Sequence, residues 1–322
     1  MKDNIVIYKG NIVFTPTKDF FKTFKDGYLV VEGGKVKGIY SELEEDLLDK
    51  KIVNYNNMLI IPGFVDLHFH APQFPNIGLG MDCELLPWLE KYTFPEEKKY
   101  EDLAYAEEVY TRLIQEFWKV GTTRVSLFAT IHEESTELLF ELFIKSGLGA
   151  YIGKVNMDRN TPKYIVEDTD ESIRKTERLI LKYMDRSELV KPIITPRFAP
   201  TCTPKLLDNL GRLALKYNLP VQSHLNENTS EIKWVHSLYL EYENYASVYN
   251  AYNLFGQTKT IMAHCIYNTE SEIDLMVKNN VYAAHCPHSN YNLSSGIMPL
   301  RKFLDRLVPV GLGTDVGGGH ST

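Results

Sequence analysis

From residue 59 onward, short runs of apolar residues alternate with longer stretches in which apolar positions recur every three to four residues. The short runs are typical of buried parallel strands, and the longer stretches are typical of amphipathic helices. Eight strands are predicted, at residues 59–68, 123–128, 150–155, 192–198, 220–224, 260–264, 281–285 and 308–314. Helices are predicted between them, among them residues 101–120, 135–146, 170–183, 204–217 and 271–279. This order predicts an α/β protein with a TIM-like (β/α)8 barrel, although a doubly wound open sheet would show a similar alternation.

The first 58 residues follow a different pattern, with short runs rich in β-branched and aromatic residues. Gly33 and Gly34 separate two such runs, and a two-residue Gly-Gly connection is typical of a β-hairpin. We therefore expect two domains: a small β domain of the sandwich type at residues 1–58, and the barrel at residues 59–322.

Histidine and aspartate residues stand at the carboxyl ends of several predicted strands. In (β/α)8 barrels the active residues lie at that end of the strands. The residues in these positions are His68, His70, His224, His264, His285 and Asp315. Their placement favours the barrel over the open sheet and predicts a functional site at the carboxyl-terminal face of the barrel.

The composition argues against several other classes of protein. The 322 residues carry a formal net charge of −7 and no basic stripe, which argues against binding to the phosphate backbone of nucleic acids. We expect no membrane-spanning helix, because no window approaches 18 consecutive apolar residues, and the first residues lack the pattern of a signal peptide. The four cysteines have no CxxC spacing and do not suggest a disulfide framework. We expect a soluble, cytoplasmic protein.

His68 and His70 are separated by one residue, so both side chains leave a strand on the same face and can converge on one ion. Two polar residues at a strand end would also explain this spacing. A buried, hydrogen-bonded polar group would likewise explain His224, His264 or Asp315 taken singly. Together the five residues form a nitrogen and oxygen donor set that suits zinc or ferrous iron. This set contains no thiolate, which disfavours copper(I) and iron–sulfur clusters.

Six motifs carry a resemblance to a known family. They are PGFVDLHFHAPQF (62–74), PRFAPTC (196–202), VQSHLNEN (221–228), MAHC (262–265), HCPHSN (285–290) and GLGTDVGGG (311–319). By these motifs the chain resembles the amidohydrolase superfamily and, within it, the guanine deaminase family. The HAPQ and HLNEN segments are the specific part of the resemblance. It implies hydrolytic deamination of guanine to xanthine and ammonia by a metal-activated water.

The resemblance also implies how the metal is held. One divalent metal, Zn²⁺ in preference to Fe²⁺, would be bound by His68, His70, His224 and Asp315. Asp315 would in addition accept a proton from the metal-activated water. His264 would lie beside that water and the substrate.

The same resemblance assigns the groups that would act on the base. Glu227, three residues after His224, would protonate a ring nitrogen of guanine while hydroxide attacks C2; zinc deaminases of another fold also use a carboxylate that is not a ligand. Gln73 and Arg197 would contact the edges of the purine, and Phe198 would add packing or a backbone contact.

Two other functions stay open. The first is a different aminohydrolase with the same metal set, acting on cytosine, an adenosine derivative or a triazine; Gln73 and Arg197 favour guanine over these substrates. The second is a barrel scaffold without catalysis. That interpretation predicts a broken ligand set, whereas all the expected ligands and Glu227 are present in the sequence.

The sequence also departs from the pattern of the family. It ends at Thr322, seven residues after Asp315, whereas the resemblance implies an eighth barrel helix after that strand and later strands that complete the N-terminal β domain. We expect both of these features to be missing from the chain. The resemblance further implies a homodimer. His285 and His288, in the HCPHSN motif, are interpreted as structural residues.

Overall fold

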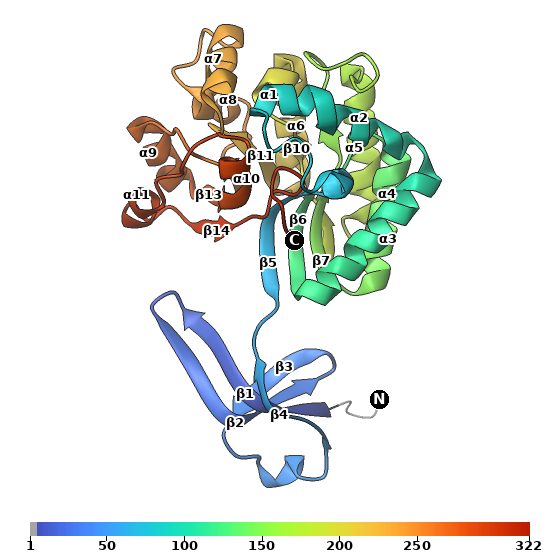
Figure 1. Ribbon diagram of the computed structural model, residues 1–322, viewed down its shortest axis with the longest axis vertical. Coiled ribbons are helices and arrows are strands. Elements are labelled where there is room, and N and C mark those ends of the chain that lie inside the picture. The colour runs from blue at the N-terminus through green and yellow to red at the C-terminus, as the bar shows by residue number, and fades with distance from the viewer. Residues whose placement is uncertain (1–4) are drawn as a thin grey trace. The chain divides into compact units, whose positions relative to one another are not determined.

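The computed structural model describes residues 5–322, and the chain forms two compact units (Figure 1). The first unit ends at Gly63, and the second runs from Phe64 to Thr322. The sequence predicted the division after residue 58, because residues 59 and 60 read as the start of the first barrel strand. In the structure these two residues end the last strand of the first unit. Pro62 and Gly63 then separate that strand from the first barrel strand.

The first unit contains a four-stranded sheet with the strand order β3-β2-β1-β4. Its strands are β1 (Ile5–Thr17), β2 (Phe20–Glu32), β3 (Lys35–Tyr40) and β4 (Lys51–Ile60). The predicted hairpin is confirmed: Gly33 and Gly34 join β2 to β3 with φ angles of 57° and 81°, which favour glycine. A sandwich of two sheets was expected. The described strands of this unit form one sheet, in which each strand pairs with its neighbour.

The strands of the second unit all pair in parallel. They are β5 (Phe64–His70), β6 (Thr122–Phe128), β7 (Gly149–Gly153), β8 (Val155–Asn156), β9 (Val190–Pro192), β10 (Thr195–Pro196), β11 (Val221–Leu225), β12 (Thr260–His264), β13 (Tyr282–His285) and β14 (Val310–Leu312). They form two four-stranded sheets, β5-β6-β7-β9 and β11-β12-β13-β14, and β8 pairs with β10. Parallel strands connected by helices are the arrangement that the sequence predicted.

Backbone contacts join the two sheets at both edges. Between β9 and β10, Ile194 forms a parallel bridge with Val221 of β11. After β14, Asp315 N donates to His68 O at 2.9 Å, and His70 N donates to Val316 O at 3.0 Å. The chain after β14 therefore lies beside β5, as in a TIM-barrel-like domain.

Two of the predicted strands are divided in the structure. The predicted strand at residues 150–155 contributes to β7 and β8, which are separated by residue 154. The predicted strand at residues 192–198 contributes to β9 and β10. Pro192 and Pro196 have no backbone N–H to donate to a neighbouring strand, which explains why the pieces of the fourth strand are short.

The helices of the second unit are α1 (Leu85–Trp88), α2 (Phe94–Lys98), α3 (Leu103–Val120), α4 (Glu133–Ser146), α5 (Thr169–Tyr183), α6 (Pro204–Tyr217), α7 (Thr229–Leu238), α8 (Tyr245–Ala251), α9 (Glu270–Asn279), α10 (Pro287–Asn292) and α11 (Leu300–Asp305). The five predicted helices are confirmed as α3, α4, α5, α6 and α9, with ends within two residues. Figure 1 shows α3 and α4 side by side over β6 and β7. Among residues 5–322, no helix has both the length and the apolar character needed to cross a membrane.

Candidate active site

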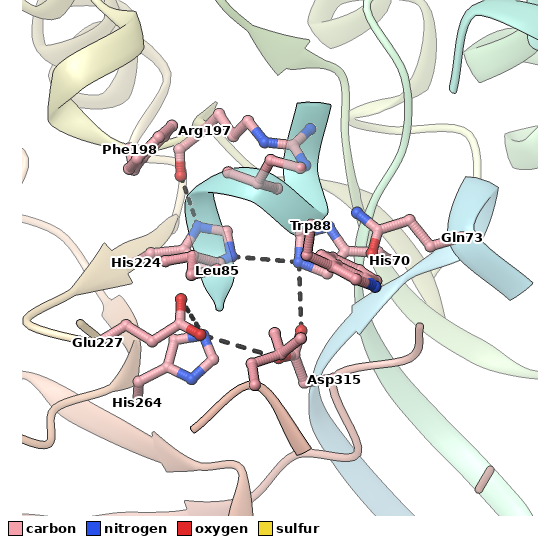
Figure 2. A pocket seen from close by; sticks show the side chains of 12 residues that line it. His70, Gln73, Leu85, Trp88, Arg197, Phe198, His224, Glu227, His264 and Asp315 are labelled. Carbon is pink, nitrogen blue, oxygen red and sulfur yellow. Dashed lines mark hydrogen bonds and ion pairs between the residues drawn. The ribbon is translucent and has the colours of Figure 1, made fainter. Parts of the chain in front are cut away.

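Four side chains that can bind a metal meet at the carboxyl ends of the barrel strands. His68 and His70 lie on β5, His224 lies on β11, and Asp315 follows β14. One donor atom from each residue lies within 4.8 Å of the others, and all four residues are buried. Figure 2 shows His70, His224 and Asp315 directed toward one another. The structure thus brings together the four residues that were expected to be ligands.

The donor atoms of this cluster face one another. His70 Nε2 lies 3.1 Å from His224 Nε2 and 3.3 Å from Asp315 Oδ1. His224 Nδ1 donates to Arg197 O at 2.6 Å, which leaves its Nε2 as an electron-pair donor. His68 Nε2 lies 3.1 Å from Asp315 Oδ1 but has no well-aligned hydrogen bond in the described part of the chain. Buried imidazole nitrogens and a carboxylate directed at one point fit a divalent cation.

The protonation states also suit a metal. Burial lowers the pKa of His70 to about 3, and burial with the neighbouring His68 and His70 holds the pKa of His224 well below its usual range. Burial acts to raise the pKa of Asp315, but His68 and His70 beside it hold that pKa well below its usual range. Neutral imidazoles and an ionised carboxylate are the forms that bind metal ions.

His264, at the end of β12, and Glu227, just after β11, lie beside the cluster (Figure 2). His264 Nε2 is 3.3 Å from Glu227 Oε2 and 3.7 Å from Asp315 Oδ2. His264 Nδ1 donates to Asn290 Oδ1 at 2.9 Å, since an amide oxygen can only accept, and this bond directs Nε2 into the site. Burial and the Asp315 charge raise the pKa of Glu227 well above its usual range, although Ser295 Oγ donates to its Oε1 at 3.1 Å. Two nearby carboxyl groups with opposite pKa shifts suit an acid and a base.

Two of these residues hold a left-handed backbone conformation. The φ angle is 71° at His264 and 52° at Asp315. Such a conformation costs about 1–3 kcal/mol at a residue other than glycine. Backbone hydrogen bonds hold both turns, because Cys265 N donates to Leu225 O at 2.9 Å and Asp315 N donates to His68 O at 2.9 Å. The sequence pattern did not predict this strain, which occurs where the two side chains line the pocket.

The expected substrate-binding residues line another wall of the same pocket (Figure 2). Gln73, Arg197 and Phe198 contribute to this wall together with Trp88 of α1. Arg197 Nη1 donates to both carboxylate oxygens of Glu97, at 2.9 and 2.7 Å, and Gln73 Nε2 donates to Glu97 Oε1 at 2.8 Å. Sequence reasoning did not identify Glu97, which is buried on α2.

The two histidines of the HCPHSN motif lie elsewhere. Neither belongs to the pocket lining formed by the described residues. The ring of His288 stacks on that of His320 with centroids 4.3 Å apart, and His285 is partly buried at the end of β13. The motif contributes to the site through its last residue, Asn290, which the sequence analysis did not single out.

A buried hydroxyl group supports the backbone behind the site. Tyr249 Oη donates to His224 O at 3.0 Å, accepts from Ala199 N at 3.0 Å and lies 2.8 Å from Ser223 Oγ. The hydroxyl of this one residue of α8 therefore holds both the strand that carries His224 and the turn that follows Phe198.

Replacing Tyr249 with phenylalanine is expected to lower the free energy of unfolding by about 1–3 kcal/mol, because several buried polar groups lose one partner together. The matched control is Tyr252→Phe, since the Tyr252 hydroxyl accepts from Tyr242 Oη at 3.2 Å at a partly exposed position. Urea unfolding followed by circular dichroism gives both values. Equal losses of stability in the two variants would contradict the supporting role of Tyr249.

Comparisons with known proteins agree with this geometry. Residues 59–322 match the family model described as the amidohydrolase family. The guanine deaminase of Dictyostelium discoideum is 46% identical over 272 residues, which cover 84% of this chain and 60% of that protein. The guanine deaminase of Homo sapiens is 44% identical over 327 residues, which cover 98% of this chain and 72% of that protein.

A solved structure is also closely similar. The crystal structure of guanine deaminase from C. acetobutylicum with bound guanine has a TM-score of 0.98 and 52% sequence identity, over 99% of this chain and 76% of that one. The chain thus spans about three fifths to three quarters of the length of these relatives. The family model covers all four residues of the metal cluster. On these grounds the chain belongs to the amidohydrolase family, in the branch formed by the guanine deaminases.

Proposed function

We propose that the chain carries the active site of a guanine deaminase, which hydrolyses guanine to xanthine and ammonia. The observation that carries this proposal is the composition of one pocket. It is lined by three of the four candidate metal ligands, His70, His224 and Asp315, and by Glu227. The two side chains suited to purine edges, Gln73 and Arg197, line it as well. The similarity to a guanine deaminase that binds guanine, at 52% identity, supports the same substrate.

One divalent metal would be held by His68, His70, His224 and Asp315. Zinc is the proposed ion, and three imidazoles with one carboxylate also suit ferrous iron. When bound, such a cation lowers the pKa of a coordinated water toward ~7 and so supplies a nucleophile near neutral pH.

The side chains would move the protons of the reaction. Glu227, with its raised pKa, would give a proton to N3 of guanine, the ring nitrogen next to C2 that carries no hydrogen, while water adds to C2. Asp315, with its lowered pKa, would accept the proton that the water loses. The amine would take that proton and leave as ammonia when the C2–N bond breaks. The new hydroxyl group would return a proton to Glu227, which restores both carboxyl groups. His264 Nε2, 3.3 Å from Glu227 Oε2 and 3.7 Å from Asp315 Oδ2, would lie beside both carboxyl groups during these transfers.

The purine would be oriented by the opposite wall of the pocket. Arg197 would donate to the carbonyl oxygen of the base, since its guanidinium has five N–H groups and only donates. Gln73 would contact a second edge, and the buried ring of Phe198 would pack against the base.

The proposal includes the wider organisation of the protein. The two parallel sheets would form a complete (β/α)8 barrel, and the sheet of the first unit would be one half of a sandwich. The assembly would be a homodimer and its location the cytoplasm. These features rest on the resemblance to the family, and the paired sheet edges at Ile194 and Asp315 support the barrel.

The complete, metal-loaded protein is expected to release ammonia from guanine and to produce the absorbance of xanthine. The same assay is run with cytosine, an adenosine derivative and a triazine, which the metal cluster alone would not distinguish. Guanine is expected to have the highest kcat/KM. A folded protein with one metal per chain that deaminates another of these compounds in preference to guanine would contradict the proposed substrate.

A further inference from the structure

We infer that Glu97 is a positioning residue that makes the pocket specific for a purine with a carbonyl oxygen at C6. The inference rests on the proposed function, because Gln73 and Arg197 are taken as the groups that contact the base. Glu97 itself does not line the pocket; it acts through these two side chains.

Glu97 connects the two residues that would bind the base. Its Oε1 accepts from Gln73 Nε2 at 2.8 Å and from Arg197 Nη1 at 2.9 Å, and its Oε2 accepts from Arg197 Nη1 at 2.7 Å. The side chains of Arg197 and Glu97 are 3% and 1% exposed, so solvent hardly competes for these bonds. Gln73 follows β5 and Arg197 follows β10, so a single carboxylate orients groups from two sides of the barrel.

The charge of Glu97 decides which atoms face the pocket. A carboxylate accepts hydrogen bonds and cannot donate, so Gln73 turns its amide nitrogen toward Glu97 while its Oε1 accepts from Gly317 N at 3.3 Å. Arg197 donates from Nη1 to Glu97. Its guanidinium lies over the ring of Phe94, 5.2 Å from the centroid, and Phe94 belongs to α2 as Glu97 does. The remaining N–H groups of Arg197 are thereby held in a fixed direction.

Guanidinium donors held in this way require an acceptor on the substrate. The carbonyl oxygen at C6 of guanine is such an acceptor. A purine with only hydrogen at C6 would leave a buried guanidinium without its partner, and a site built to bond a polar group rejects an analogue that lacks the group. Discrimination would therefore occur at C6, on the opposite side of the six-membered ring from N3, while the reaction occurs at C2.

The test compares guanine with 2-aminopurine, which has the same amine at C2 and no oxygen at C6. In Glu97→Gln, an amide NH₂ replaces one acceptor oxygen and meets an N–H of Arg197 or Gln73. We expect kcat/KM for guanine to fall about 100-fold as the purine-binding groups are displaced. The value for 2-aminopurine should fall much less, because 2-aminopurine has no C6 oxygen for Arg197 to bond and loses only the contact made by Gln73. Ammonia release gives both rates, and metal analysis confirms that the variant keeps its ion.

The neighbouring Glu96 supplies a matched control. It lies on the same helix and is also buried, but its carboxylate bonds to Lys99 and Tyr105 and does not line the pocket. Glu96→Gln should keep the preference of the parent for guanine. Glu97→Asp keeps the negative charge and should recover part of the preference that Glu97→Gln loses.

The outcomes are distinct. Equal losses on guanine and 2-aminopurine in Glu97→Gln, or the same loss of preference in Glu96→Gln, would overturn the role of Glu97. If the parent converts 2-aminopurine too slowly to measure, its inhibition constant against guanine gives the same comparison. A metal-loaded parent that does not deaminate guanine would overturn the proposed function itself, and this is established before any variant is measured.

Discussion

A Glu227→Gln variant is expected to keep its metal and to lower kcat for guanine about 10²–10⁴-fold, the range of a positioned acid or base. The amide preserves the shape of the side chain but cannot release a proton to N3. The effect should fall mainly on kcat, since Glu227 is not one of the four residues of the metal cluster and lies on a different wall from Gln73. Steady-state kinetics with guanine and metal analysis of the same sample measure both parts of this prediction.

The matched control for this variant is Glu241→Gln, because Glu241 is an exposed carboxylate after the end of α7. It should leave kcat within the error of the parent. A Glu227→Gln protein that is metal-loaded and keeps most of the parent's kcat would show that the proton comes from another group.

Removal of the metal is expected to abolish deamination and to lower the melting temperature. The imidazole nitrogens of His70 and His224 lie 3.1 Å apart in a buried site, and a cation bound to both would offset the repulsion between their electron pairs. A ligand that binds only the folded state stabilises it by about 4 kcal/mol when its concentration is 1,000 times its Kd. The measurement is guanine turnover and thermal unfolding after dialysis against a chelator, and again after adding one equivalent of zinc or ferrous iron.

Variants in which one candidate metal ligand is replaced distinguish the loss of the metal from other effects of the chelator on the protein. His70→Ala should bind less than one equivalent and lose activity, whereas His236→Ala, which changes an exposed histidine on α7, should retain both metal and activity. Full turnover of guanine by protein stripped of metal would overturn the metal-dependent mechanism. The ion that restores the higher kcat identifies the better cofactor.

The grouping of His68, His70, His224 and Asp315 could be predicted from the sequence because each of these residues carries a local signal. His68, His224 and Asp315 all follow short apolar runs, and the topology of parallel strands brings the ends of such runs together. The boundaries of α6 were predictable for a similar reason, since Thr203 and Pro204 are typical of a helix start. Local chemistry determines these features, so a single sequence contains them.

The residues that orient the site were not predictable in this way. Glu97 lies 100 positions before its partner Arg197, a residue that was expected at the site, and nothing in the segment PEEK distinguishes Glu97 from Glu96. Asn290 and His264 are 26 positions apart, on segments that meet because β12 and β13 pair. Their roles depend on long-range packing, which the spacing of residues does not encode.

The helix α7 is an intermediate case. Asn228 and Glu231 form a capping box at its start, and an Asn followed three residues later by Glu is a recognisable signal for a helix. The helices predicted from the sequence nevertheless did not include α7. The same Glu231 accepts from the backbone N–H of Glu227 at 2.9 Å, so the start of the helix also fixes the proposed acid.

The position of Glu97 on the segment between β5 and β6 bears on how such enzymes diversify. The residues proposed to bind the metal come from strand ends, which the pairing of the strands must keep in place. Glu97, which is proposed to orient the side chains that would bind the purine, comes from a short helix in one connecting segment, and changes in such segments leave the strand pairing intact. On this proposal, a change of substrate needs changes in one connecting segment only, while the residues proposed for the reaction stay in place.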